Sequence, residues 1–98
     1  MIKNLEKLIA KVYNINERLY GGQTMLDKII DIISKRTNVS ANEISPDTNI
    51  LDLDVDSLDI INIIMDVEYA FSMHFEDEEI IDIRTARDIE QIIIKFFN

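Results

Sequence analysis

The chain has 98 residues, of which 47% are hydrophobic, so it can close one modest core and leaves no room for a second domain. Ten basic residues stand against nineteen acidic ones, and the formal net charge of −9 excludes nucleic acids and anionic membranes as natural partners and favours a basic protein surface. Because the chain contains no cysteine, disulfides, thiolate zinc sites and a thiol nucleophile of its own are excluded as well.

The first predicted element is an amphipathic helix that ends near Tyr20, because apolar residues recur there at helical spacing. Two glycines follow it. The charge changes at the same place, since residues 1–23 hold four basic and two acidic residues, whereas residues 24–98 hold six basic and seventeen acidic ones. We therefore expect an N-terminal helical extension over residues 1–23 and a single domain over residues 24–98.

The second predicted helix begins after Thr24, whose side chain can cap it with Asp27 as the capping-box partner, and it ends near Asn38. From Val39 to Val55 the helical spacing is lost, and Asn, Asp, Ser and Pro residues accumulate. This stretch predicts a long ordered loop rather than a helix.

The third predicted helix begins at Asp56 or Ser57 and runs to about Phe71, with Asp56 as its N-cap. An acidic run then predicts one or two helical turns, and a last helix begins at Thr85, with Asp88 three residues further on. No alternating strand pattern of any length competes. The expected fold is therefore all-α: an antiparallel four-helix bundle with three longer helices and a short one, plus the extra N-terminal helix.

The helix predicted after Asp56 carries two apolar stripes, where a surface helix in a bundle needs one. The stripe expected to face the core consists of Ile60, Ile63, Ile64, Val67 and Phe71. Leu58, Ile61 and Met65 lie on roughly the opposite side. Either the N-terminal helix covers this second stripe, or the stripe is open for partner proteins. We favour docking, because methionine adapts to several partners and the neighbouring acids would attract a basic surface.

Ser57 occupies a position where a serine is usually only a helix cap. Here Asp56 can provide the cap, which leaves the Ser57 hydroxyl in the first turn and facing solvent. A phosphodiester attached to this hydroxyl would lie against unpaired backbone N–H groups at the positive end of the helix dipole. The location therefore suits a phosphate-linked group.

Residues 24–98 contain the string LDLDVDSLDIINIIMDVEYAF with its Asp-Ser-Leu core at Ser57, then an acidic run from Phe75 to Glu79, and a final helix after Thr85. In this combination of features they resemble bacterial acyl carrier proteins. Two positions depart from the family pattern: Asp54 replaces the usual glycine, and Asn62 replaces a usual acid.

The resemblance implies that a phosphopantetheinyl transferase attaches 4'-phosphopantetheine from coenzyme A to Ser57. The arm then carries acyl groups as thioesters, in fatty acid biosynthesis or related polyketide or specialised acyl pathways of lipid metabolism. The implied partners are acyl-transferring and acyl-modifying enzymes with basic surfaces. The implied docking residues are Asp56, Leu58, Asp59, Ile61, Met65, Asp66, Glu68, Asp77 and Glu78. The implied acyl pocket comprises Ile50, Leu53, Val67, Phe75 and Ile80.

Other kinds of function fit the sequence less well. The alternating Asp52, Asp54 and Asp56 suggest a calcium loop, but Ser57 and Ile63 stand where that loop needs Gly and Glu, so no metal site is expected. His74 is the single histidine, and without cysteine no nucleophilic triad can be assembled, so we do not expect an enzyme.

Two further alternatives stay open at this point. One is an acidic helical interaction module without a prosthetic group, and the other is an aminoacyl or peptidyl carrier. No stretch approaches the roughly 18 apolar residues that span a bilayer, and the N-terminus lacks the apolar core of a signal peptide. We therefore expect a cytoplasmic protein that does not bind membranes.

Overall fold

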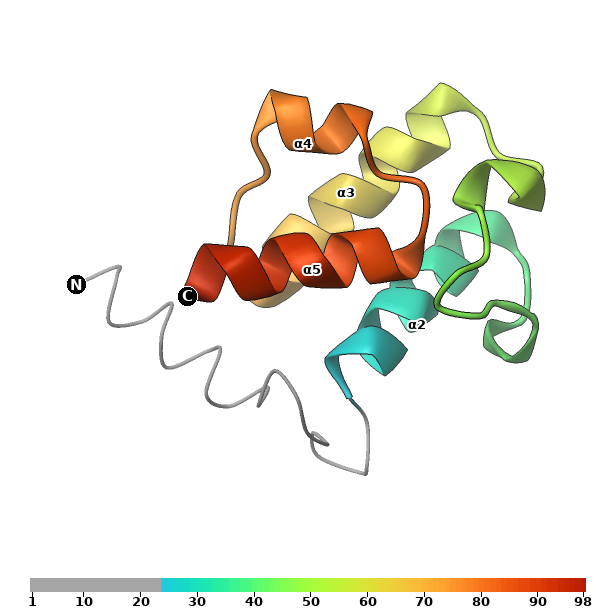
Figure 1. The fold of residues 1–98 in the computed structure, drawn as a ribbon. Helices are drawn as coiled ribbons and strands as arrows, with labels where there is room; N and C mark the ends of the chain where they lie inside the picture. Colours follow the sequence, from blue (N-terminus) through green and yellow to red (C-terminus); the bar gives the residue numbers. More distant parts are fainter. Residues whose placement is uncertain (1–23) are drawn as a thin grey trace.

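The computed structural model describes residues 24–98, which form helices joined by loops and contain no β-strand (Figure 1). The α-helices in this part of the chain are α2 (Met25–Thr37), α3 (Ser57–Phe71), α4 (Asp77–Ile81) and α5 (Ala86–Phe97). The prediction of an all-α fold with three longer helices and a short one is confirmed for these residues. The predicted helical extension over residues 1–23 lies outside the described part.

Reciprocal caps fix the starts of α2 and α5. The Thr24 hydroxyl accepts from the backbone N–H of Asp27 at 3.1 Å, and the Asp27 carboxylate accepts from the Thr24 N–H at 3.1 Å. Thr85 and Asp88 repeat this arrangement at the start of α5, at 3.1 Å and 3.0 Å. Such caps satisfy N–H groups that the helix itself leaves unpaired, and each contributes about 1 kcal/mol. Both capping boxes are those predicted from the sequence.

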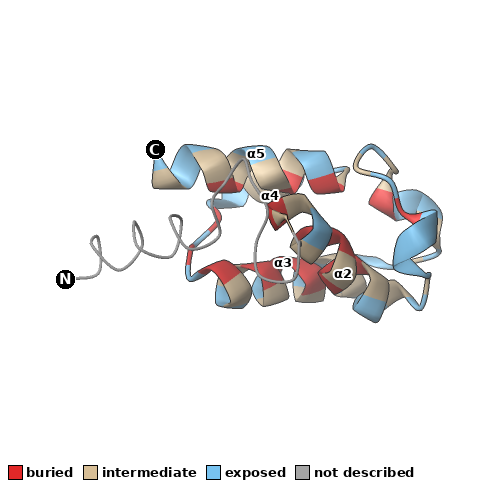
Figure 2. Cartoon of the chain, turned by 90° about the horizontal axis from the view of Figure 1, so that it is seen from below, coloured by how far each residue is buried: buried red, intermediate tan, exposed pale blue. Residues whose placement is uncertain are grey.

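The core lies between the three longer helices. Helix α2 packs against both α3 and α5, and it runs in the opposite direction to them (Figure 1). Each helix contributes residues that are 1% exposed or less: Ile29, Ile33, Ile63, Val67, Ile89 and Ile93. The buried stretches of α3 and α5 lie on the sides that face each other (Figure 2). Burial of a side chain of this size stabilises the fold by about 1.5–3 kcal/mol.

The connection from α2 to α3 contains two single turns of 3₁₀ helix, η2 (Ala41–Glu43) and η3 (Ile50–Leu53). The sequence predicted an ordered loop without a helix in this stretch. The connection is ordered, as predicted, but the prediction missed the two 3₁₀ turns. Side chains explain both turns, because Ser40 and Asn49 accept hydrogen bonds from backbone N–H groups two residues ahead.

The same connection is tied to the junction between α4 and α5. The backbone N–H of Ile50 donates to the carbonyl of Arg84 at 2.8 Å, and the N–H of Arg87 donates to the carbonyl of Pro46 at 3.0 Å. The Arg87 guanidinium also binds the Asp47 carboxylate with Nε at 2.8 Å and Nη2 at 3.4 Å. These bonds hold η3 beside the α4–α5 junction and next to the start of α3.

None of the helices in residues 24–98 is both long and apolar enough to pass through a lipid bilayer.

Candidate functional site

The site is built around the first turn of α3, where Asp56 is the N-cap. Its carboxylate accepts from the backbone N–H of Asp59 at 3.0 Å, and the Asp59 carboxylate accepts from the N–H of Asp56 at 3.3 Å. Asp56 itself has an extended backbone, with φ −105° and ψ 179°. Because Asp56 takes the capping role, Ser57 becomes the first residue of the helix and its side chain has no structural duty there.

The surroundings of Ser57 fit a covalently attached phosphate. Ser57 is exposed, and within residues 24–98 no hydrogen bond engages its hydroxyl. The capping box occupies the N–H of Asp59, but the N–H groups of Ser57 and Leu58 have no partner in the described part of the chain. These donors lie at the positive end of a helix of 15 residues. A phosphodiester on Ser57 would therefore find unpaired donors and a favourable dipole.

The other serines of the chain lack this combination. The Ser34 hydroxyl donates to a backbone carbonyl at 2.6 Å. Ser40 and Ser45 accept from backbone N–H groups at 3.4 Å and 3.3 Å, so their hydroxyls stabilise local turns. Ser72 ends α3 with φ 51°, at the negative end of the helix dipole, where an anion is disfavoured. Ser57 is thus the best serine of the chain for an anionic adduct.

A largely apolar cleft of about 470 Å³ opens beside Ser57. Its walls come from η3, the first turn of α3, and the end of α4 with the junction that follows. The lining residues are Ile50, Leu51, Ser57, Ile60, Ile61, Ile80, Ile81, Ile83 and Arg84. An apolar chain attached through Ser57 would find contact surface in this cleft.

The cleft brings together only part of the acyl pocket expected from the sequence. Ile50 and Ile80 line it, whereas Leu53 does not. Val67 and Phe75 are 0% and 1% exposed and belong to the packed core. Sequence reasoning missed Arg84, because no periodicity or motif marks a junction residue that reaches the cleft through the tertiary fold.

The second apolar stripe of α3 is exposed. Leu58 is 67% exposed, Ile61 44% and Met65 58%. Tyr69, which is 89% exposed, follows Met65 by four residues and extends the stripe by one turn. Tyr69 is not among the docking residues expected from the sequence, although its spacing from Met65 could have revealed it. The alternative that the N-terminal helix covers this stripe depends on residues outside the described part.

Two of the predicted docking acids, on the later turns of α3, bind groups outside that helix. Asp66 binds the Arg36 guanidinium at 2.6 Å and 3.1 Å, and this hydrogen bond and the charge of Asp66 raise the pKa of Arg36. Glu68 accepts from the backbone N–H of Phe75 at 2.9 Å, and His74 Nδ1 lies 3.2 Å from the same carboxylate. Glu68 therefore anchors the turn after α3 as well as belonging to the acidic surface.

The remaining predicted docking acids lie near the two helix starts. Asp77 and Glu78 are exposed in the first turn of α4, where their negative charges interact favourably with the positive end of the helix dipole. Asp56 and Asp59 are engaged in the capping box of α3, which leaves their charge at the surface beside Ser57. The starts of α3 and α4 are therefore both acidic at the surface.

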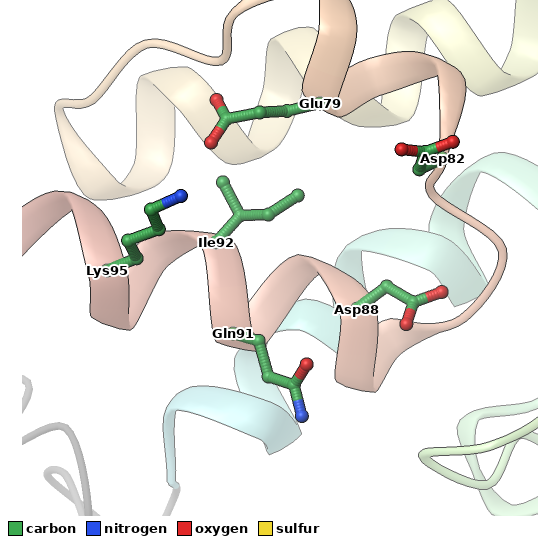
Figure 3. Close-up of a pocket in the computed structure, with 6 residues that line it drawn as sticks. All are labelled: Glu79, Asp82, Asp88, Gln91, Ile92 and Lys95. Carbon is green, nitrogen blue, oxygen red and sulfur yellow. The ribbon is translucent and has the colours of Figure 1, made fainter.

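A second cleft, of about 320 Å³, lies between α4 and α5 (Figure 3). Glu79 and Asp82 line it from the side of α4, and α5 contributes Asp88, Gln91, Ile92 and Lys95. Neither Ser57 nor any predicted docking residue borders this cleft. Within residues 24–98 no group of three or more acidic or histidine side chains is placed to hold a metal ion.

Comparisons with known proteins point to the same part of the chain. Residues 27–93 match the protein family described as "Phosphopantetheine attachment site". The acyl carrier protein of Syntrophobacter fumaroxidans is 39% identical over 69 residues, which cover 69% of this chain and 85% of that protein. The acyl carrier protein of Rubrobacter xylanophilus is 34% identical over 74 residues, which cover 74% of this chain and 91% of that protein.

Proposed function

Because the chain belongs to the acyl carrier protein family, we propose that Ser57 is the residue to which its 4'-phosphopantetheine arm is attached. The chain is a phosphopantetheine-bearing acyl carrier. One observation carries the choice of residue: Ser57 is an exposed serine at the start of a long helix whose cap is supplied by the residue before it. That arrangement leaves both its hydroxyl and the neighbouring N–H groups available.

The attachment is a phosphoryl transfer from coenzyme A. The Ser57 oxygen forms a bond to the phosphorus next to pantetheine, the bond from that phosphorus to the pyrophosphate oxygen breaks, and 3',5'-adenosine bisphosphate leaves. The serine proton goes to a base of the phosphopantetheinyl transferase, because no base is bonded to Ser57 among the described residues. The terminal thiol of the arm then supplies the nucleophile that this cysteine-free chain lacks.

Partner enzymes are proposed to dock on α3 and α4. The contact residues proposed are the exposed apolar Leu58, Ile61 and Met65, and the acids Asp56, Asp59, Asp66, Glu68, Asp77 and Glu78. Basic surfaces on the transferase and on acyl-transferring and acyl-modifying enzymes would complement them. The apolar residues supply contact area, and the acids supply orientation and speed of encounter. In this scheme the partners perform the chemistry, and this chain presents the substrate.

The Arg36–Asp66 ion pair gives this docking surface a testable detail. Asp66 can bind a basic partner only if it shares or releases Arg36, and both side chains are more than a third exposed. Replacing Arg36 by Gln should therefore strengthen binding of a basic partner, whereas replacing Asp66 by Asn should weaken it. Equal binding of both variants and the wild type, measured by calorimetry, would exclude Asp66 from the interface.

We propose fatty acid biosynthesis or a related polyketide or specialised acyl pathway as the setting. The support is that the relatives are themselves called acyl carrier proteins. An aminoacyl or peptidyl carrier is the alternative. Offering the phosphopantetheine form to a malonyl transferase and to amino acid-activating enzymes separates the two, because only the matching enzyme forms a thioester. The cytoplasmic location expected from the sequence stays a prediction.

We also propose that residues 24–98 are sufficient as the carrier domain. The family match begins at residue 27 and ends at residue 93, and the caps of α2 and α5 lie at or inside the proposed ends. A chain of residues 24–98 should accept the arm as fast as residues 1–98 do. A truncated chain that cannot be modified would show that the N-terminal residues belong to the functional unit.

The test of Ser57 is co-expression with a phosphopantetheinyl transferase followed by intact-mass measurement. The phosphopantetheine increment is expected in the wild type and absent in Ser57→Ala. Ser72→Ala is the matched control, because Ser72 is exposed at the other end of α3, and this variant should gain the increment normally. An increment that persists in Ser57→Ala would overturn the assignment.

A further inference from the structure

Arg84 differs from the other arginines that the structure describes. Arg36 and Arg87 each bind a carboxylate through two nitrogens, Arg36 to Asp66 and Arg87 to Asp47. Arg84 has no carboxylate partner within residues 24–98, although acids there outnumber basic residues seventeen to six. A guanidinium without an ion pair is unexpected on so acidic a domain, because arginine readily forms hydrogen-bonded ion pairs with nearby carboxylates.

The Arg84 side chain is held by its own junction. Its Nη1 donates to the backbone carbonyls of Ile81 at 2.8 Å and Ile83 at 2.9 Å. Its backbone is fixed on both sides, because its carbonyl accepts from the Ile50 N–H at 2.8 Å and its N–H donates to the Asp88 carboxylate at 2.9 Å. Nε and Nη2 have no partner in the described part of the chain. The guanidinium therefore presents two nitrogens with free N–H donors, Nε and Nη2, from a fixed position.

This position is the wall of the cleft that also contains Ser57. Arg84 is the single charged residue among the residues that line the cleft, and apart from Ser57 the others are aliphatic. A cation that borders an apolar cleft interacts more strongly with an anion than it would in open water. The cleft is thus apolar along its length with one fixed positive group.

We propose that Arg84 binds an oxyanion delivered on the arm attached to Ser57. This inference rests on the proposed attachment at Ser57. The oxyanion is either the phosphodiester of the arm or a carboxylate at the free end of an acyl cargo, since Nε and Nη2 of arginine suit both groups.

Tethering explains how so acidic a domain binds an anion at all. The net charge of −9 repels free anions, and Asp82 lies two residues from Arg84. A group attached through Ser57 has an effective concentration in the millimolar range, so even a weak contact is populated. Free succinate should accordingly leave the Arg84 resonances unchanged in the unmodified chain.

The experiment uses the full chain, as wild type and as Arg84→Gln, in unmodified, phosphopantetheine, butyryl and succinyl forms. Intact mass verifies each form. Melting temperature and the Arg84 Nε–H resonance are then recorded. Lys28→Gln is the matched control, because it removes an equal positive charge from α2 and Lys28 does not line the cleft.

If the cargo supplies the oxyanion, the succinyl form of the wild type melts about 2–4 °C above the butyryl form, and Arg84→Gln abolishes the difference. If the phosphodiester supplies it, the phosphopantetheine form melts higher than the unmodified form, again only with Arg84 present. In both cases the Arg84 Nε–H resonance shifts at the step that introduces the oxyanion, and Lys28→Gln keeps the difference in melting temperature.

If the differences in melting temperature between the forms were the same in the wild type and in Arg84→Gln, and the Arg84 Nε–H resonance did not move, the role of Arg84 would be overturned. The attachment at Ser57 would not be affected by that result. Failure of the chain to gain the phosphopantetheine increment would instead overturn the attachment at Ser57. The two failures are therefore distinguishable.

Discussion

Asp56 has two roles, because its side chain caps α3 and also places a negative charge beside Ser57. Two substitutions at this position can separate the cap from the charge. Asp56→Ala removes the side-chain acceptor that binds the Asp59 N–H at 3.0 Å, whereas the backbone N–H of residue 56, which donates to the Asp59 carboxylate at 3.3 Å, is kept. Loss of such a cap costs about 1 kcal/mol, because a backbone N–H of α3 loses its partner. For a domain of this size that corresponds to a melting temperature about 4–8 °C lower.

Asp56→Asn is the matched variant, since asparagine caps helices as well as aspartate does. It loses a charge that favours the helix dipole, worth about 0.3–1 kcal/mol, but it also relieves repulsion from neighbouring acids such as Asp54 and Asp59. We therefore expect Asp56→Asn to stay close to the wild type in stability while it slows modification of Ser57 by a basic transferase.

Urea unfolding followed by circular dichroism measures the free energy of unfolding of both variants. Modification is followed by the rate of appearance of the phosphopantetheine form. If Asp56→Asn lost as much stability as Asp56→Ala, the Asp56 cap would not explain how α3 begins, and Ser57 could not be taken as free of a capping role.

The backbone at Asp54, the Arg87–Asp47 ion pair and the net charge each allow a further test. Asp54 adopts the left-handed conformation, with φ 58° and ψ 49°, which glycine accepts without steric strain. Asp54→Gly should therefore raise the free energy of unfolding by about 0.5 kcal/mol, whereas Asp54→Ala should not. A urea midpoint that is higher for Asp54→Ala than for Asp54→Gly would contradict this prediction. The hydrogen bond from Arg87 lowers the pKa of Asp47 below its ordinary 3.8, so the pair stabilises the fold above about pH 4 and the contribution is lost as the pH falls through the lowered pKa. Stability measured from neutral to acid pH should fall less steeply in Arg87→Gln than in the wild type, and an unchanged slope would dismiss the pair. Finally, magnesium or moderate salt should raise the melting temperature, because residues 24–98 hold seventeen acidic residues against six basic ones and repel themselves. A melting temperature that neither magnesium nor salt changes would show that this repulsion does not limit stability.

The helix starts could be predicted because the information for them is local. Thr24, Asp56 and Thr85 each cap a helix with an acid three residues ahead, and a side chain that bonds to a nearby N–H needs no knowledge of the rest of the fold. The exposed stripe of α3 was predictable for the same reason, since helical spacing alone puts Leu58 and Met65 on one face.

The cleft could be predicted only in part, because its walls come from segments far apart in the chain. Whether an apolar residue faces the core or the cleft depends on how α4 and η3 pack, so Phe75 lies in the core while Ile81, at 69% exposure, lines the cleft. The position of Arg84 depends in turn on hydrogen bonds to Ile81 and Ile83 carbonyls. No sequence pattern encodes such contacts.

Fragmentation of the modified chain locates the adduct and so tests attachment at Ser57 directly. Fragmentation of the modified chain in the mass spectrometer should place the phosphopantetheine group on Ser57, and on none of Ser34, Ser40, Ser45 and Ser72. An adduct on any of those four serines, or a chain that stays unmodified by several transferases, would contradict attachment at Ser57.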